Sequence, residues 1–331
     1  MFSIIIPLHN GEKTIARALA SLISSKEYID EVIIVNDRST DNYLDEIKPF
    51  TRFLNIVHVD SEFDKGPGGA RRTGLLKATG TFVGFLDADD CYTASCLYYV
   101  NKQILENPDA VVIRAKTIYY ESGDFNPEDI EYSVGSCGGN FYNRFYLIRN
   151  QLLPHESLFM AEDEYFNAII DRHMEYVGEE EKTLYFDYPV YEVHHDSDIY
   201  TSFALGNWVD YACKYHLLMA EYMVDHCIAV DEMDDNVEDN FISSLVFCFL
   251  MCNAMMYDDF MLIDSVPHFN RAIKYYEKTF GKNVDNIVRW FEEDDVRVAD
   301  LKTAAEGSTG IQFDEVISFR KFMCACKGGI G

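Results

Sequence analysis

The first 90 residues alternate between short apolar runs and longer helix-like segments. The apolar runs lack the polar alternation of a half-exposed strand, which predicts strands buried on both faces, at 2–6, 31–36, 54–59 and 81–86. The segment 14–24 repeats its apolar residues at helical spacing, and 68–80 is a helical run between glycines. This order of elements predicts a mostly parallel sheet covered by helices on both faces.

The pattern changes twice after residue 92. Residues 93–200 mix helical and extended periods, with helices expected at 94–105 and 162–172 and strands at 110–120 and 182–195. Only helical patterns follow Thr201, at 203–227, 238–258, 268–280, 283–293 and 311–325. We therefore expect an α/β domain over 1–200 and an α-helical region over 201–331.

Polar residues gather where the predicted strands end. In a parallel sheet, ligands bind in the crevice at the carboxyl ends of the strands. The side chains that the sequence puts there are His9 and Asn10 after the first strand, Asp37 after the second, and Asp87, Asp89 and Asp90 after the fourth.

The three carboxylates in "GFLDADDCY" indicate a bound cation. Asp87, Asp89 and Asp90 repel one another, and burying them unpaired is costly. Their oxygen ligands suit Mg²⁺ or Mn²⁺, which commonly bridge to substrate phosphates. Arg71 and Arg72, after a glycine-rich turn, offer positive charge to the same phosphates. An isolated Asp-x-Asp also occurs as ordinary turn chemistry, but this position after a buried strand favours a metal–diphosphate site with a nucleotide as its carrier.

Charge is unevenly distributed along the chain. It carries 28 basic and 56 acidic residues, a net charge of −28. Residues 1–110 contribute −5 (11 basic, 16 acidic) and residues 111–331 contribute −23 (17 basic, 40 acidic). A field of this sign disfavours nucleic acid and anionic lipid as partners.

Cysteine usage and apolar segments predict a cytoplasmic protein. The nine cysteines include no zinc-type Cys-x-x-Cys pair and lie in apolar surroundings, so we interpret them as small buried side chains in a reducing compartment. The N-terminus lacks the basic leader and cleavage site of a signal peptide. The apolar run 241–257 is short, polar in places and flanked by acids, which indicates a core helix and no transmembrane segment.

Four segments in order resemble the family-2 glycosyltransferases of the GT-A fold. They are "FSIIIPLHN", "DEVIIVNDRSTDN", "GPGGARRTGLLKATGTFVGFLDADD" and "AEDEYFNAII". The resemblance covers about residues 1–200 and implies a nucleotide-binding half at 1–92 and an acceptor half at 93–200. It implies an inverting, metal-dependent transfer of a sugar from a nucleotide-diphosphate donor, UDP in most members, to a hydroxyl of a polysaccharide or glycoconjugate.

The resemblance also implies roles for single residues on the donor side. Pro7 and Asn10 would line the nucleotide pocket, Asp37 would accept a hydrogen bond from the base, and Arg71 would face the nucleotide. Asp87 would contact the ribose or the metal.

The remaining roles concern the cation and the acceptor. Asp89 would bind the Mn²⁺ or Mg²⁺ ion with Asp90 beside it, and Asp163 falls where the family keeps its general base. Asp at a helix start is also a good capping residue. His194 or His195 would supply a further metal ligand; the alternative is that both are ordinary surface or packing histidines. The aromatic residues of 138–150 would stack on a sugar ring or belong to the core.

Three positions depart from the family pattern: His9, Arg38 and Arg72 replace the usual Tyr, small residue and Asn. Because of these replacements, the resemblance does not specify which nucleotide and which sugar form the donor. Three other functions make different demands on the sequence. A glycosyltransferase acting on a hydroxymethylated base of phage DNA would need a basic track, and a sugar nucleotidyltransferase would need a glycine-rich basic loop after the first strand. A non-enzymatic binding protein would not need the carboxylates Asp37, Asp89 and Asp163.

Overall fold

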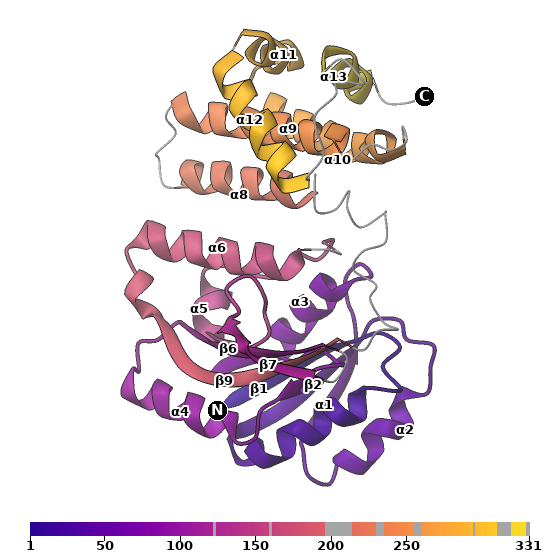
Figure 1. Ribbon diagram of the computed structural model, residues 1–331, viewed down its shortest axis with the longest axis vertical. Helices are drawn as coiled ribbons and strands as arrows, with labels where there is room; N and C mark the ends of the chain where they lie inside the picture. The colour runs from indigo at the N-terminus through magenta and orange to yellow at the C-terminus, as the bar shows by residue number, and fades with distance from the viewer. Residues whose placement is uncertain are drawn as a thin grey trace. The chain divides into compact units, whose positions relative to one another are not determined.

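The computed structural model describes residues 1–121, 124–158, 161–195, 214–229, 235–254, 260–293, 295–309 and 319–328. Contacts between residues divide the chain into two compact units, Met1–Thr201 and Ser202–Gly331. The described part of the first unit is a sheet with helices on both faces, and that of the second is helical (Figure 1).

The first half of the sheet is parallel, as predicted. Its strands lie in the order β3-β2-β1-β4 and are β1 (Phe2–Leu8), β2 (Ile29–Asn36), β3 (Ile56–Asp60) and β4 (Phe82–Phe85). Ile4, Ile5 and Ile6 on β1 are all fully buried. Successive residues of a strand face opposite sides of the sheet, so a strand with no exposed face must be covered on both.

Helices supply that cover. Figure 1 shows α1 (Ile15–Leu22), α2 (Tyr43–Ile47) and α4 (Cys96–Glu106) on one face of the sheet, and α3 (Pro67–Lys77) on the other. The short 3₁₀ helices η1 (Ile23–Tyr28) and η2 (Lys48–Phe50) extend α1 and α2. The apolar stripe of α1 packs in one cluster with Ile4, Ile6 and Leu8 of β1.

The α3 helix lies close to β1 because a glycine faces the strand. A Cβ atom built on Gly74 would come 2.3 Å from Cγ2 of Ile5. We expect Gly74→Ala to lower the free energy of unfolding by about 1–3 kcal/mol through overpacking, partly offset by a gain of about 1 kcal/mol in helix propensity. Urea denaturation measures this. Gly135→Ala is the matched control, because its Cβ would meet one atom at 4.0 Å; equal unfolding midpoints for the two variants would contradict the packing argument.

The second half of the sheet is mixed. It continues β4-β8-β6-β9-β5, with β7 paired to β6. The strands are β5 (Cys91–Tyr92), β6 (Val112–Glu121), β7 (Asp124–Tyr132), β8 (Asn140–Asn143) and β9 (Thr183–His195). β6 and β9 are parallel and match the predicted strands 110–120 and 182–195, whereas β8 is antiparallel to β4 and β6, and β5 is antiparallel to β9. The sequence analysis missed β5 and β8, which are too short to show a period, and β7, which contains Pro127.

Three further helices complete the described part of this unit. They are α5 (Arg144–Arg149), α6 (Glu162–Val177) and the 3₁₀ helix η3 (Glu180–Lys182). The predicted helices 94–105 and 162–172 correspond to α4 and α6, although α6 runs one turn further and ends at Gly178, whose φ is +68°. A left-handed glycine is a common helix stop.

The second unit contains α8 (His216–Ala229), α9 (Asp235–Ala254), α10 (Phe260–Phe280), α11 (Val284–Glu293), α12 (Asp295–Thr309) and α13 (Phe319–Gly328). Helix α9 packs against α8, α10 and α12 and is buried around much of its circumference. That position confirms the core helix predicted for the apolar run 241–257 as far as Ala254; residues 255–257 lie outside the described residues. Within the ranges given above, no helix combines the length and apolarity needed to cross a bilayer.

After Thr201, the predicted helices agree with the structure wherever the structure describes the residues concerned. Helices α8 to α11 and α13 overlap the predicted segments, but 203–213, 255–258 and 311–318 lie outside the described residues. Helix α12 was not predicted. Val298 and Ala305 are buried while Val296 is exposed, so the apolar residues of this helix do not share one face.

The cysteines are mostly buried, as expected. Among those that the structure describes, Cys91, Cys96, Cys137, Cys248 and Cys326 are buried thiols. Cys324 is the exception and is exposed.

Candidate functional site

The loops after β1 and β2 are joined at the carboxyl edge of the sheet. Asn10 has φ +54°, in the left-handed region that Asn tolerates. Its backbone N–H donates to Oγ of Ser39 at 3.0 Å, and its side-chain oxygen accepts from the N–H of Thr40 at 2.8 Å. Pro7 pairs with Val35 of β2 near the end of β1, just before this loop. The two predicted nucleotide-pocket residues therefore lie where two strands end.

Asp37 connects three loops. Its carboxylate is buried, and Oδ2 accepts from the backbone N–H of Gly66 at 2.8 Å. Oδ1 accepts from Nη1 of Arg38 at 2.6 Å, and the other arm of Arg38 donates to the carbonyl of Phe63. His9 hydrogen-bonds the Asp37 carbonyl through Nδ1 at 2.7 Å. Two of the departures from the family pattern, His9 and Arg38, thus make direct contacts with the residue expected to recognise the base.

Arg71 is buried between two carboxylates. Nη2 donates to Oδ1 of Asp87 at 2.8 Å, and Nη1 donates to Oε1 of Glu162. Burial disfavours the charged guanidinium, but the two carboxylates outweigh this effect and hold the pKa of Arg71 well above its usual value. The arms of Arg71 bridge the acidic loop to the start of α6, and its predicted position facing the nucleotide stays a prediction. Glu162 was not singled out, because one more acid in "AEDE" gives no signal of a buried partner.

Asp90 faces β9. Its Oδ2 accepts from the hydroxyl of Tyr191 and its Oδ1 from the backbone N–H of His194, both at 2.9 Å. The same tyrosine oxygen accepts from the N–H of Asp87 at 3.0 Å. Burial, followed by the charges of Asp87 and Asp89, raises the pKa of Asp90 to about 8. These hydrogen bonds therefore fix the Asp90 side chain against β9, at the wall of the site.

The three carboxylates of the acidic loop do not converge as a set of three ligands. In the described ranges they form no group whose ligand atoms lie within 4.8 Å of one another. Asp87 is turned to Arg71, Asp90 is turned to β9, and the backbone carbonyl of Asp89 accepts from Arg17. Two of the three predicted cation ligands, Asp87 and Asp90, are thus engaged by other protein groups, and a cation shared by Asp87, Asp89 and Asp90 stays a prediction.

Asp163 opens α6 beside this network. The preceding Ala161 has φ +58°, and the N–H of Glu164 donates to Oδ1 of Asp163 at 2.9 Å. Burial raises the pKa of Asp163; the positive charge of Arg71 opposes this and the negative charge of Asp87 adds to it. The side chain is therefore within electrostatic reach of both groups that link the acidic loop to α6.

The first turns of α6 are fixed by buried polar contacts. Asn167 donates to the carbonyl of Asp163 at 2.9 Å, and its own carbonyl oxygen accepts from the Tyr142 hydroxyl at 2.8 Å and from Arg114 at 3.1 Å. Arg114 is fully buried and also donates to Asp171 at 2.6 Å. Since buried polar groups that are fully paired resist displacement, Asp163 is held on a rigid element.

The aromatic residues of 138–150 divide between core and surface. Phe141, Tyr142 and Tyr146 are buried, whereas Phe145 is 58% exposed beneath the Arg144 guanidinium. The core interpretation therefore holds for the first three. Of the two candidate histidines, His194 lies on β9 beside Glu192, and the side chain of His195 lies outside the described residues.

Comparison with known sequences gives one family. Residues 3–167 match the family described as "Glycosyl transferase family 2". WfgD of Escherichia coli, a UDP-Glc:alpha-D-GlcNAc-diphosphoundecaprenol beta-1,3-glucosyltransferase, is 34% identical over 107 residues, which are 32% of this chain and 42% of that protein. TarS of Staphylococcus aureus, a poly(ribitol-phosphate) beta-N-acetylglucosaminyltransferase, is 35% identical over 116 residues, which are 34% of this chain and 18% of that protein. The chain thus spans less than half the length of these two relatives.

Comparison with solved structures gives the same fold. The crystal structure of S. aureus TarS 1–349 in complex with UDP-GlcNAc superposes with a TM-score of 0.63 at 21% identity, and the match covers 96% of this chain and 98% of that one. A second crystal structure of the same TarS fragment, 1–349, gives a TM-score of 0.60 at 20% identity. The mixed α/β architecture predicted from the sequence is therefore that of GT-A proteins.

Proposed function

The chain belongs to glycosyl transferase family 2 through residues 3–167, and on that premise we propose that it transfers a sugar from a nucleotide-diphosphate donor to a hydroxyl acceptor. The observation that carries the proposal is the Asp87–Arg71–Glu162 bridge. It ties the acidic loop after β4, which contains Asp89, to the start of α6, which contains Asp163. A cation-binding carboxylate and a proton-accepting carboxylate on the same edge are what an inverting sugar transfer needs.

The nucleotide would lie over the loops after β1 and β2. Asp37 offers a buried carboxylate whose two oxygens are already oriented by Gly66 and Arg38. Each carboxylate oxygen has a second lone pair, so Asp37 can also accept a hydrogen bond from the N–H of a base. Pro7 and Asn10 form the adjoining wall in this proposal.

The residues of the acidic loop fit a hard divalent cation held by Asp89. All potential ligands in "DADD" are oxygen atoms, which Mn²⁺ and Mg²⁺ prefer. Asp87 is paired with Arg71, Asp90 accepts hydrogen bonds from Tyr191 and His194, and Asp89 is the second aspartate of the Asp-x-Asp pattern. A bound cation would offset the negative charge that develops on the departing diphosphate.

Asp163 is proposed as the general base. The acceptor oxygen forms a bond to the anomeric carbon on the face opposite the diphosphate, while the bond from that carbon to the diphosphate oxygen breaks and its electron pair leaves with the nucleotide. The hydroxyl proton passes to the Asp163 carboxylate. Arg71 acts as a positioning residue, because its buried charge holds Asp87 and Glu162 together next to that carboxylate.

The relatives favour UDP-sugars as donors and glycoconjugates as acceptors. The names of WfgD and TarS specify a diphosphoundecaprenol-linked sugar and poly(ribitol-phosphate) as acceptors. Neither the net charge of −28 nor these relatives support the alternative acceptor, a modified base in DNA. A cytoplasmic location beside a membrane-bound assembly stays a prediction.

A thermal-shift comparison of donors tests this function. We expect UDP-GlcNAc or UDP-glucose with Mn²⁺ to raise the melting temperature, whereas GDP-mannose with Mn²⁺ serves as the matched control and leaves it nearly unchanged. A ligand at about one hundred times its Kd stabilises the folded state by about 2.7 kcal/mol. No shift with any UDP-sugar, or an equal shift with GDP-mannose, would contradict the proposed donor class.

A further inference from the structure

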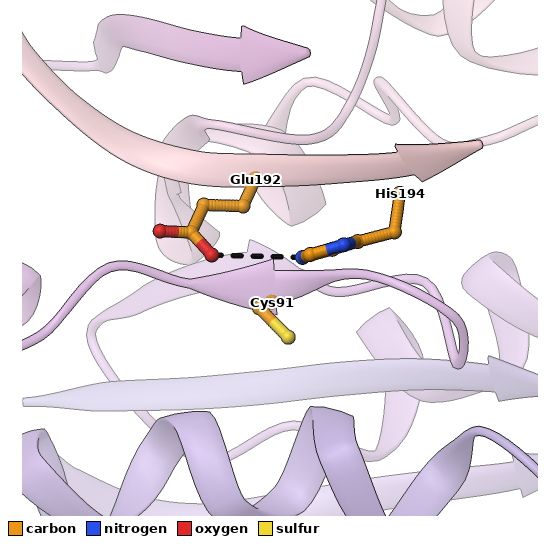
Figure 2. A group of neighbouring side chains, drawn as sticks. All are labelled: Cys91, Glu192 and His194. Atoms are coloured by element: carbon orange, nitrogen blue, oxygen red, sulfur yellow. Dashed lines mark ion pairs between the residues drawn. The ribbon is translucent and has the colours of Figure 1, made fainter. Parts of the chain in front are cut away.

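A thiol, a carboxylate and an imidazole lie together on the β5–β9 strand pair. Figure 2 shows Glu192 and His194 extending from β9 toward β5, which carries Cys91. One ligand atom from each of the three residues lies within 4.8 Å of the other two. None of the roles assigned above uses Cys91 or Glu192.

The register of the two strands produces this group. Cys91 is directly opposite Glu192 in the antiparallel pair, so their side chains share one face of the sheet. His194 is two residues beyond Glu192 on the same strand and therefore lies on that face as well. Strand pairing thus brings Cys91 next to Glu192 and His194, which follow it by about one hundred positions in the chain.

The imidazole is oriented but incompletely paired. The ring of His194 stacks on Tyr120 with centroids 4.9 Å apart and an angle of 4° between the planes. Its Nε2 atom is buried, accepts or donates no hydrogen bond within the described part of the chain, and lies 3.6 Å from Oε2 of Glu192. The Cys91 thiol is buried, and its hydrogen-bond contact is a long one, 4.0 Å to the carbonyl of Arg17. We propose that Cys91, Glu192 and His194 bind a Zn²⁺ ion.

The ligand types select zinc over the cations expected at Asp89. Mn²⁺ and Mg²⁺ prefer oxygen ligands throughout, whereas a thiolate with an imidazole favours Zn²⁺. A thiolate and a carboxylate together carry two negative charges, which balance the charge of the ion. Zn–S and Zn–N bonds of about 2.3 and 2.0 Å require the three ligand atoms to draw somewhat closer than their present limit of 4.8 Å.

Metal binding at this place releases the thiol proton to solvent, and the sulfur lone pair forms the bond to zinc. A coordinating thiol binds as the thiolate, so the ion replaces the proton of Cys91. Three protein ligands leave one tetrahedral position for water. The ion would pin β5 to β9 beside the His194 N–H that holds Asp90.

Cobalt spectroscopy of the full chain tests the site without an activity assay. Co²⁺ takes the place of Zn²⁺ in such sites, and a bound cysteine gives an intense near-ultraviolet thiolate-to-cobalt charge-transfer band. We expect the metal-free protein to develop this band with one equivalent of Co²⁺ and to lose it when Zn²⁺ is added. Cys91→Ser should abolish the band, and His194→Gln should weaken Co²⁺ affinity at least about 10-fold.

Two control variants separate this site from other metal binding. Cys324→Ser removes the exposed thiol, which is the most accessible competing ligand, and should leave the band unchanged. Asp89→Ala removes the proposed donor-side cation ligand and should also leave it unchanged, so failure of the zinc site and failure of the proposed transferase are distinguishable. Absence of the band in the wild-type protein, or its persistence in a folded Cys91→Ser variant, would overturn the proposal. If Cys91→Ser does not fold, full retention of Co²⁺ affinity by His194→Gln overturns it equally.

Discussion

Substitution of Asp89 by Ala is expected to abolish both sugar transfer and hydrolysis of the donor. Asp89, the second aspartate of the Asp-x-Asp pattern in the acidic loop, is the carboxylate proposed to hold the cation. A metal ion contributes several kcal/mol of charge stabilisation, and about 1.4 kcal/mol changes a rate tenfold, so we expect a loss of at least about 100-fold in kcat/KM. Release of the nucleotide product at varied Mn²⁺ concentration measures the effect.

The matched control is Asp109→Ala, which removes an exposed acid in the loop after α4. It should retain full activity, and both variants should keep the wild-type unfolding midpoint. If the Asp89→Ala protein is folded and keeps normal Mn²⁺-dependent turnover, Asp89 is not the residue that binds the cation.

Substitution of Asp163 by Asn is expected to preserve donor binding and to slow turnover. The amide matches the carboxylate in shape but cannot accept the acceptor's proton, and general-base catalysis contributes about 100-fold to 10,000-fold. Single-turnover kinetics, with donor affinity measured by calorimetry, separate the two effects.

A pH profile adds a second readout for Asp163. Because burial raises the pKa of this carboxyl, wild-type turnover should fall as the pH drops through the raised pKa, where the base becomes protonated. Glu164→Gln, one residue further along α6, is the matched control and should keep both the rate and the profile. Unchanged kcat in Asp163→Asn would place the base on another residue.

The sequence predicted the first half of the sheet well, because period and composition carry that information locally. Strands buried on both faces are continuous apolar runs, and α1 shows its buried stripe through Ile15, Leu19 and Leu22. The antiparallel insertion of β8 between β4 and β6 has no such signal. It depends on long-range pairing of four residues, Asn140–Asn143, that carry no period of their own.

The sequence predicted where residues of the candidate site lie in the fold, but it did not predict which residues they contact. The sequence placed Asp37, Asp87, Asp89 and Asp163 at strand or helix ends, and the structure has them there. It did not predict that Arg71 would be buried between Asp87 and Glu162, or that Asp90 would be held by Tyr191 and the His194 N–H. Except for the pairing of Arg71 with Asp87, those contacts join residues roughly one hundred positions apart, and no local pattern reports the pairing of such distant groups.

The most direct measurement is an anomalous difference map from crystals soaked with UDP and Mn²⁺. The account predicts one manganese peak between the Asp89 carboxylate and the diphosphate, with the uracil ring over Asp37 and open space between the diphosphate and Asp163 for the sugar and the acceptor. A nucleotide bound at that edge with its manganese away from Asp89, or bound elsewhere on the chain, would contradict it.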